Sequence, residues 1–248
     1  MTMTRPPGRA GTRHLPAAAD RSPNPLGPPT LIVIAKEPLP GRVKTRLTPP
    51  YTPREAARFA AAALADTLDA VASASRTLGV RPLVVLDGHP GHWLPREFAL
   101  RAQVDGPLDV RLAAAFDAVR GQPALLVGMD TPQITPAGLL RAAARLRRDT
   151  DAAFGRAQDG GWWLLGLGAA DGDLVRGVPT SQPDTGARQH TRLRHAGLRV
   201  VDLPVLRDVD TAADIAPVAT LVPRGRFAAV AADLRSRSCD PAGARETA

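Results

Sequence analysis

The 248 residues suffice for one large α/β domain or two small ones, and the single cysteine, Cys239, excludes an internal disulfide and a cysteine-based zinc cluster. No apolar stretch approaches the roughly 20 residues that span a bilayer. The formal net charge is +8, but part of the excess lies in the N-terminal end and the internal arginines are scattered, which favours a small phosphate ligand over a nucleic acid.

Both ends of the chain differ in composition from the middle. Residues 1–29 are rich in Pro, Gly, Arg and Ala without periodicity, which predicts a disordered N-terminal extension. Residues 232–248 are polar and predict a C-terminal tail, so that one domain is expected over residues 30–231. The N-terminus lacks the apolar run of a secretory signal, and we therefore expect a cytoplasmic protein.

Strand and helix signals alternate between these ends. Thr52, Pro53 and Glu55 predict a helix start, because they supply an N-cap, a proline at the first helical position and a capping box. The alternation predicts an α/β fold with a mostly parallel sheet covered on both faces, whose ligand sits beyond the carboxyl ends of the strands. Strands are expected at 30–35, 82–86, 124–128, 152–155, 162–167 and 198–203, and helices at 52–74, 109–119, 136–148, near 187–196 and after 211.

The loop after the first strand is rich in cations. It carries Lys36, Arg42, Lys44 and Arg46 together with Gly41. Gly41 lets backbone N–H groups approach an anion closely, and the cations neutralise it. Lys36 and Lys44 are also the only lysines in a chain that otherwise uses arginine. We therefore expect this loop to bind phosphate.

Carboxylates follow two later strands. Asp130 comes directly after a buried strand, and Asp208 and Asp210 point to the same side if their segment is extended. Hard cations such as Mg²⁺ prefer carboxylate oxygens and share them with substrate phosphates. Asp130 and Asp210 are therefore predicted to hold Mg²⁺ or Mn²⁺, although an ordinary turn at Asp130 is an alternative. Asp214 is interpreted only as the capping partner of Thr211.

Asp159, Gly160 and Gly161 precede two tryptophans, Trp162 and Trp163. Asp-Gly-Gly is the turn chemistry of a hairpin, and a plain hairpin is one interpretation. In the functional interpretation, the two glycines let a substrate approach, and Asp159 orients or deprotonates an acceptor. Adjacent tryptophans on a strand point to opposite faces, so one is expected in the core and the other beside a pocket.

Four segments in this order resemble one family. They are Lys-x-Pro-x-Pro-Gly-x-Val-Lys-Thr-Arg-Leu (36–47), Gly-x-Asp-x-Pro (128–132), Asp-Gly-Gly-aromatic-x-Leu-x-Gly-Leu (159–167) and Asp-Val-Asp-Thr-x-x-Asp (208–214). They resemble the DUF2064 family, the group called rSAM/selenodomain-associated transferase 1, over about residues 30–222. The resemblance implies a GT-A, nucleotide-diphospho-sugar transferase fold and glycosyltransferase activity. The first and last segments are also similar to 2-phospho-L-lactate and molybdenum cofactor guanylyltransferases.

The resemblance implies that Asp130 and Asp210 bind the metal and that the loop over 36–46 binds the nucleotide phosphates. It further implies that Gln103, Asp109 and Arg111 lie near the base or ribose, although the spacing here departs from the family's pattern.

Three functions remain open from the sequence. The leading one is a Mg²⁺-dependent transferase that moves a group from a nucleotide-activated donor, most simply a nucleotide sugar, to a small-molecule acceptor. Four cations in one loop suit a triphosphate, which favours the alternative of a nucleotidyltransferase that releases pyrophosphate from an NTP. A nucleotide-binding protein without turnover is the third.

Overall fold

A single seven-stranded sheet forms the centre of the protein, whose computed structural model describes residues 25–239. The strand order is β3-β2-β1-β4-β6-β5-β7, and only β6 runs antiparallel to its neighbours. The predicted mostly parallel α/β sheet is therefore confirmed. The strands are β1 (Thr30–Lys36), β2 (Leu83–Asp87), β3 (Ala99–Ala102), β4 (Ala124–Gly128), β5 (Asp151–Ala157), β6 (Trp162–Leu167) and β7 (Arg199–Leu206).

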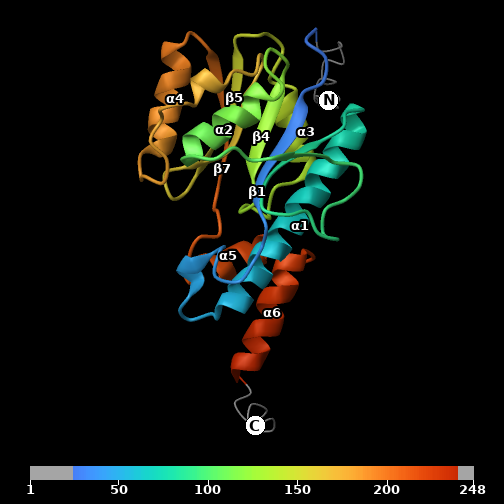
Figure 1. Ribbon diagram of the computed structural model, residues 1–248, viewed down its shortest axis with the longest axis vertical. Coiled ribbons are helices and arrows are strands. Elements are labelled where there is room, and N and C mark those ends of the chain that lie inside the picture. The colour runs from blue at the N-terminus through green and yellow to red at the C-terminus, as the bar shows by residue number, and fades with distance from the viewer. Residues whose placement is uncertain (1–24, 240–248) are drawn as a thin grey trace, which may run out of the picture.

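Helices cover both faces of this sheet, and two more pack behind the longest of them (Figure 1). One face carries α1 and α3, the other α2 and α4, and α5 and α6 lie against the far side of α1. The helices of the described residues are α1 (Pro53–Leu78), α2 (Leu108–Asp117), α3 (Pro136–Ala143), α4 (Thr185–His195), α5 (Ala212–Leu221) and α6 (Arg226–Cys239), with the 3-10 turns η1 (Thr45–Leu47) and η2 (Gly172–Leu174). None of the helices between residues 25 and 239 combines the length and the apolarity needed to cross a membrane.

The side chains of β1 explain why both faces are covered. Leu31 and Val33 belong to the core cluster beneath α1 and α3, whereas Ile32 belongs to the cluster beneath α2 and α4. All three are fully buried, because successive side chains of a strand point to opposite faces. A strand that is apolar on both faces is typical of a central position in a parallel sheet.

Helix α1 connects the sheet to the outer pair α5 and α6. It begins with the predicted capping box, in which Thr52 Oγ1 accepts from Glu55 N and Glu55 Oε2 accepts from Thr52 N. Ala60 packs in the cluster beneath the sheet, while Phe59 and Ala63 pack in the cluster formed with α5 and α6. Small alanine side chains let neighbouring elements approach α1 on both sides, so this helix is buried along most of its length.

Two boundaries differ from the sequence predictions. Helix α3 ends at Ala143 rather than near Arg148, because the buried Asp151 carboxylate accepts from the backbone N–H groups of Arg147 and Arg148 and holds them outside a helix. The predicted domain boundary at 231 falls inside α6, where Leu234 is buried in the core. Residues 1–24 and 240–248 of the predicted end segments lie outside the described residues.

Candidate functional site

The carboxyl edge of the sheet gathers the predicted site residues. Six of the seven strands are parallel, so their carboxyl ends meet at one edge. Lys36 is the last residue of β1, and Asp130, Asp159 and Asp208 each lie two residues beyond the end of β4, β5 and β7. The topology therefore places one cation and three carboxylates at the same end of the molecule.

The segment after β7 then crosses this edge. Gln158 N donates to Leu206 O at 2.9 Å, which prolongs the pairing of β5 with β7. Three residues later, Val209 N donates to Asp130 O at 3.0 Å, although β6 and β5 separate β4 from β7 in the sheet. The chain between these two hydrogen bonds passes over the ends of β5 and β6. It carries Asp208 to Asp159 and Asp210 toward Asp130.

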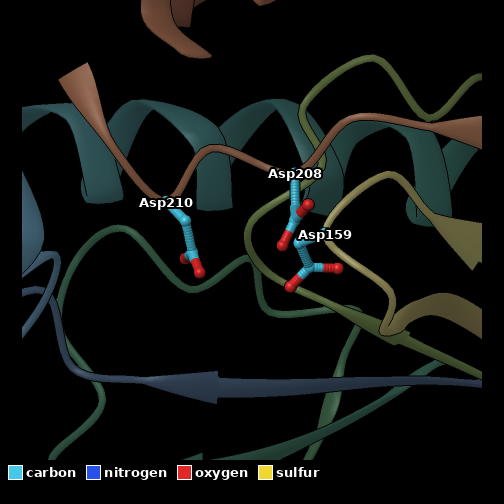
Figure 2. Close-up of side chains that lie close together, drawn as sticks. All are labelled: Asp159, Asp208 and Asp210. Carbon is cyan, nitrogen blue, oxygen red and sulfur yellow. The ribbon is translucent and has the colours of Figure 1, made fainter. Parts of the chain in front are cut away.

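The carboxylates of Asp159, Asp208 and Asp210 form an acid trio (Figure 2). An oxygen from each lies within 4.8 Å of the others, with Asp208 and Asp210 on the crossing segment and Asp159 on the β5–β6 turn. Among residues 25–239, no ion pair neutralises Asp159 or Asp208. Burial, followed by repulsion from Asp159 and Asp210, raises the pKa of Asp208 to about 6. The site therefore concentrates negative charge that its own cations do not balance.

Lys44 lies between the two carboxylates that the sequence assigned to a metal. Its Nζ is 2.8 Å from Asp130 Oδ1 and 3.3 Å from Asp210 Oδ1, and only 7% of its side chain is exposed. Burial alone would lower the pKa of Lys44, but the charges of Asp130 and Asp210 outweigh it and raise that pKa. Arg46 Nη1 lies 3.3 Å from the other oxygen of Asp210. Both cations are thus already paired.

The other two cations of the loop are differently placed. Lys36 and Arg42 are exposed, and neither has an ion-pair partner within the described part of the chain. Gly41 has φ +75° with open space where a Cβ would lie, so glycine is needed there for backbone conformation alone. The loop therefore offers two unpaired cations and an accessible turn, as the phosphate-binding prediction requires.

The glycine pair of the β5–β6 turn has a packing role that was not predicted. Gly160 has φ +92°, and a Cβ there would overlap the carbonyl oxygen of Pro183. Gly160 O accepts from Gly186 N, in the first turn of α4, at 2.7 Å. The space beside Gly160 is filled by this neighbouring chain, which corrects the expectation of an opening for a substrate. The Asp159 side chain remains exposed, and its Oδ1 accepts from Gly161 N at 2.8 Å.

The two tryptophans point to opposite faces, as predicted. Trp163 is buried beneath α1 and α3, and its Nε1 donates to Pro204 O at 3.0 Å. Trp162 is partly buried on the other face, 6.5 Å from Phe154 between ring centroids. Both rings pack against the core, so the expectation that one of them lines a pocket finds no support among these contacts.

Arg111, predicted to contact the nucleotide, lies in a separate polar cluster after β2. Its Nη1 is 2.9 Å from Asp87 Oδ2 and 3.4 Å from Gln103 Oε1. Gln103 also donates to the carbonyls of Ala35 and Val85, which fixes it to the ends of β1 and β2. These three residues lie together at the carboxyl edge.

Asp109 belongs elsewhere. Its Oδ2 accepts from Gly177 N at 2.8 Å, which ties α2 to the segment after η2. The structure therefore separates Asp109 from Arg111 and Gln103, although the sequence grouped all three.

Two residues of the site neighbourhood were missed. Arg207 donates through Nε to Gln158 Oε1 at 2.7 Å and lies 3.8 Å from Asp214 Oδ1, while its carbonyl oxygen accepts from Gln133 Nε2. Asp87 was not singled out either, although a carboxylate at the end of a buried strand was the available signal. The predicted capping box of Thr211 and Asp214 is present and fixes the far end of the crossing segment.

Comparisons with known proteins agree with this fold. The profile of the family DUF2064, described as an uncharacterized protein conserved in bacteria, matches residues 54–182. A solved structure of a candidate nucleotide-diphospho-sugar transferase from Desulfovibrio desulfuricans G20 is 25% identical, with a TM-score of 0.72 over 84% of this chain and 95% of that one. A nucleotidyl transferase from Methanothermobacter thermautotrophicus is 20% identical, with a TM-score of 0.50 over 77% of this chain and 96% of that one. The curated proteins include no significant match.

Proposed function

The chain belongs to the DUF2064 family, and from that premise we propose that it is a divalent-cation-dependent transferase acting on a nucleotide-activated donor, most simply a nucleotide sugar. The acid trio carries this proposal, because two of its three carboxylates lack a cation in the described part of the chain. A basic loop with two unpaired cations lies at the same edge of the sheet. Carboxylates beside phosphate-binding cations are the setting in which proteins hold a metal–nucleotide complex.

The acid trio fits Mg²⁺ or Mn²⁺. All its donor atoms are carboxylate oxygens, which hard divalent cations prefer. Burial, and then repulsion from Asp159 and Asp210, raises the pKa of Asp208, and a cation would relieve that repulsion. When bound, the cation would offset the negative charge that develops on the donor phosphates as the leaving group departs. We assign Asp208 and Asp210, which belong to the acid trio, to the cation. Asp130, predicted as a ligand, lies outside the acid trio and pairs with Lys44.

The loop cations are assigned to the donor phosphates. Lys36 and Arg42 are free to bind them, and the open turn at Gly41 allows backbone N–H groups to approach. Lys44 and Arg46 are paired with Asp210 and reach the phosphates only if they exchange partners. Two free cations match the charge of a diphosphate, which is our reason to place a nucleotide sugar ahead of a triphosphate.

Transfer from a nucleotide sugar requires a partner on the acceptor side. The bond between the anomeric carbon and the phosphate oxygen breaks, its electron pair leaves with the nucleoside diphosphate, and an acceptor hydroxyl oxygen bonds to the carbon. The hydroxyl proton needs a base. Asp159 is the exposed member of the acid trio, so we assign it to orient the acceptor hydroxyl and take its proton.

A nucleotidyltransferase is the second candidate, and the four cations of the loop favour it. Release of Lys44 and Arg46 from Asp210 would give the loop the charge that suits a triphosphate. Arg111 beside Asp87 and Gln103 offers polar groups for a base or ribose in either candidate.

The donor test is an incubation with Mg²⁺ and a panel of nucleotide sugars and NTPs. Release of a nucleoside diphosphate from a nucleotide sugar supports the leading proposal, whereas pyrophosphate released from an NTP contradicts it in favour of the second. Nucleotide binding by calorimetry without turnover of any donor would show a protein that only binds nucleotides. Lys36→Ala should weaken donor binding and leave the circular dichroism spectrum unchanged, while Arg145→Ala, at an exposed position after α3, serves as the control.

A further inference from the structure

The Lys44 ammonium occupies the position of a bridging cation. It contacts one oxygen of Asp130 at 2.8 Å and one oxygen of Asp210 at 3.3 Å. Two-metal enzymes hold their ions about 3.5–4 Å apart and share a carboxylate between them. Here the shared carboxylate is that of Asp210. Its Oδ1 contacts Lys44 Nζ, and the same side chain belongs to the acid trio.

The backbone conformation of the loop fixes Lys44 in this position. The residue has left-handed dihedrals, φ 50° and ψ 38°, and its carbonyl oxygen accepts from Leu47 N at 2.9 Å at the start of η1. Its neighbours Val43 and Leu47 are buried and anchor the loop on both sides of the lysine. On the opposite side, the hydrogen bond from Val209 N to Asp130 O joins the two segments that carry the carboxylates.

The position of the Lys44 ammonium group also limits what can bind beside it. The group lies between the two carboxylates, and only 7% of the Lys44 side chain is exposed. A divalent cation placed between Asp130 and Asp210 would have to displace the Lys44 ammonium group from both carboxylates, although the Lys44 side chain is buried. A cation within the acid trio would instead lie beside Asp208 and Asp159, two carboxylates that no ion pair neutralises among the described residues.

We propose that Lys44 takes the place of a second metal ion, so that the protein binds a single divalent cation, within the acid trio. This inference rests on the proposed function, because it assumes that the acid trio binds a cation at all. It predicts that removing the ammonium group creates a second cation site between Asp130 and Asp210.

Mn²⁺ binding to the full chain tests the proposal, with the bound ion counted by electron paramagnetic resonance and calorimetry in the absence of nucleotide. The wild type should bind one Mn²⁺. Lys44→Met, which keeps an unbranched side chain of similar length and removes its charge, should bind two. Lys44→Met combined with Asp130→Asn should return to one. Lys36→Met is the matched control on the same loop and should still bind one.

Two Mn²⁺ on the wild type, or one on Lys44→Met, would overturn the proposal while leaving the proposed function intact. No Mn²⁺ on any variant, with or without a nucleotide, would overturn the proposed cation dependence as well.

Single carboxylate variants keep the proposal testable if Lys44→Met does not fold. Asp130→Asn should change the Mn²⁺ dissociation constant of the wild type by less than about threefold, whereas Asp208→Asn should weaken binding by at least the roughly 10–100-fold typical of a lost outer-shell partner. Loss of binding in Asp130→Asn would contradict the single-cation arrangement.

Discussion

The two edges of the sheet each carry three clustered aspartates, and they differ in how the charge is balanced. At the amino edge, Arg120 Nη2 lies 2.9 Å from both Asp117 Oδ1 and Asp171 Oδ1 and 3.5 Å from Asp173 Oδ2. Arg176 adds a second contact, 3.0 Å, to Asp117 Oδ2. At the carboxyl edge, Lys44 and Arg46 both pair with Asp210, and Asp159 and Asp208 keep their charge without an ion pair among the described residues.

This difference separates structural acids from candidate functional ones. An acid cluster that only shapes the surface is stabilised when every carboxylate pairs with a cation, as at the amino edge, where two arginines share the three aspartates. An uncompensated cluster weakens the fold through repulsion and burial of charge, and it persists where a ligand supplies the missing charge. If a ligand supplies the missing charge at the carboxyl edge, substitutions there should affect turnover and cation binding, and matched substitutions at the amino edge should not.

The largest expected effect is on turnover. Asp210→Asn removes the carboxylate shared by the acid trio and by Lys44 and Arg46, so we expect kcat with the active donor and Mg²⁺ to fall by about 10²–10³, the loss typical of one electrostatic group in an active site. Asp173→Asn at the amino edge is the control and should stay within about threefold of the wild type. Equal losses in both variants would mean that the edges do not differ in function.

The next effect is on stability and concerns a glycine at each edge. Gly160→Ala at the carboxyl edge would clash with Pro183 O at a positive φ, and should cost about 1–3 kcal/mol of unfolding free energy from the clash and about 1–2 kcal/mol from the backbone. Gly172→Ala at the amino edge would clash with Ala113 O and should cost about 1–3 kcal/mol. Urea denaturation measures both values.

The two glycine variants should differ in Mn²⁺ binding. Gly160→Ala displaces the turn that carries Asp159, and should therefore weaken Mn²⁺ binding, whereas Gly172→Ala should leave it unchanged. Unchanged Mn²⁺ binding in Gly160→Ala would show that the position of this turn does not matter to the cation.

The contrast between edges also shows what the sequence could predict. The buried strands, the capping boxes and the cationic loop are local signals, and the structure contains each of them near its predicted position. Strand β3 was missed because it has four residues, of which three are exposed, and therefore lacks an apolar pattern. Helix α6 was missed because its second half, Asp233 to Cys239, is mostly charged and polar, and because its alanine-rich first half gives little apolar contrast.

The pairing of charges in the site was not readable from the sequence. The strand-end positions of Asp130 and Asp210 predicted that both lie at one edge, which is confirmed. Lys44 lies between them because the segment after β7 crosses the sheet edge at this point. The crossing is a tertiary feature, fixed by the hydrogen bond from Val209 N to Asp130 O, and the sequence alone does not reveal it. The position of Asp159 beside Asp208 likewise follows from the pairing of β5 with β7, although β6 and α4 separate these two strands along the chain.

A pH dependence of stability should distinguish the carboxyl edge in metal-free protein. The folded-state pKa of Asp208 is about 6, above its ordinary value of 3.8, so the native state holds this proton more tightly than the unfolded chain. The stabilisation from this group is therefore present at low pH and is lost as pH rises from about 4 to 6. In EDTA, Asp208→Asn should melt at a higher temperature than the wild type at pH 7.5, and the difference should shrink toward pH 4.5.

The same melting curves contain their own control. Above about pH 7, Asp208 is ionised in both states, and the difference in melting temperature between the variant and the wild type should be constant. Addition of Mn²⁺ at pH 7.5 should raise the melting temperature of the wild type and not that of Asp208→Asn, because only a ligand bound to the native state stabilises it. A difference that grows toward pH 4.5 would contradict the proposed repulsion within the acid trio.

The smallest effect should come from Arg207, which connects the two segments of the acid trio without belonging to it. Its side chain links Gln158, the neighbour of Asp159, to the helix-capping Asp214. Arg207→Ala removes both links and keeps the backbone oxygen that accepts from Gln133. We expect Mn²⁺ affinity to fall only a few-fold, because the hydrogen bond between Gln158 N and Leu206 O still holds the segments together.

A double-mutant cycle separates positioning by Arg207 from a general loss of charge. If Arg207 acts through Gln158, Gln158→Ala should weaken Mn²⁺ binding to a similar extent, and the double variant should be little worse than either single one. Arg207→Lys keeps the positive charge but not the Nε donor, so it should recover little of the affinity if the hydrogen bond matters and most of it if the charge does. Additive losses would mean that Arg207 and Gln158 act on the acid trio independently of each other, and no loss in any variant would mean that the backbone alone holds the crossing segment in place.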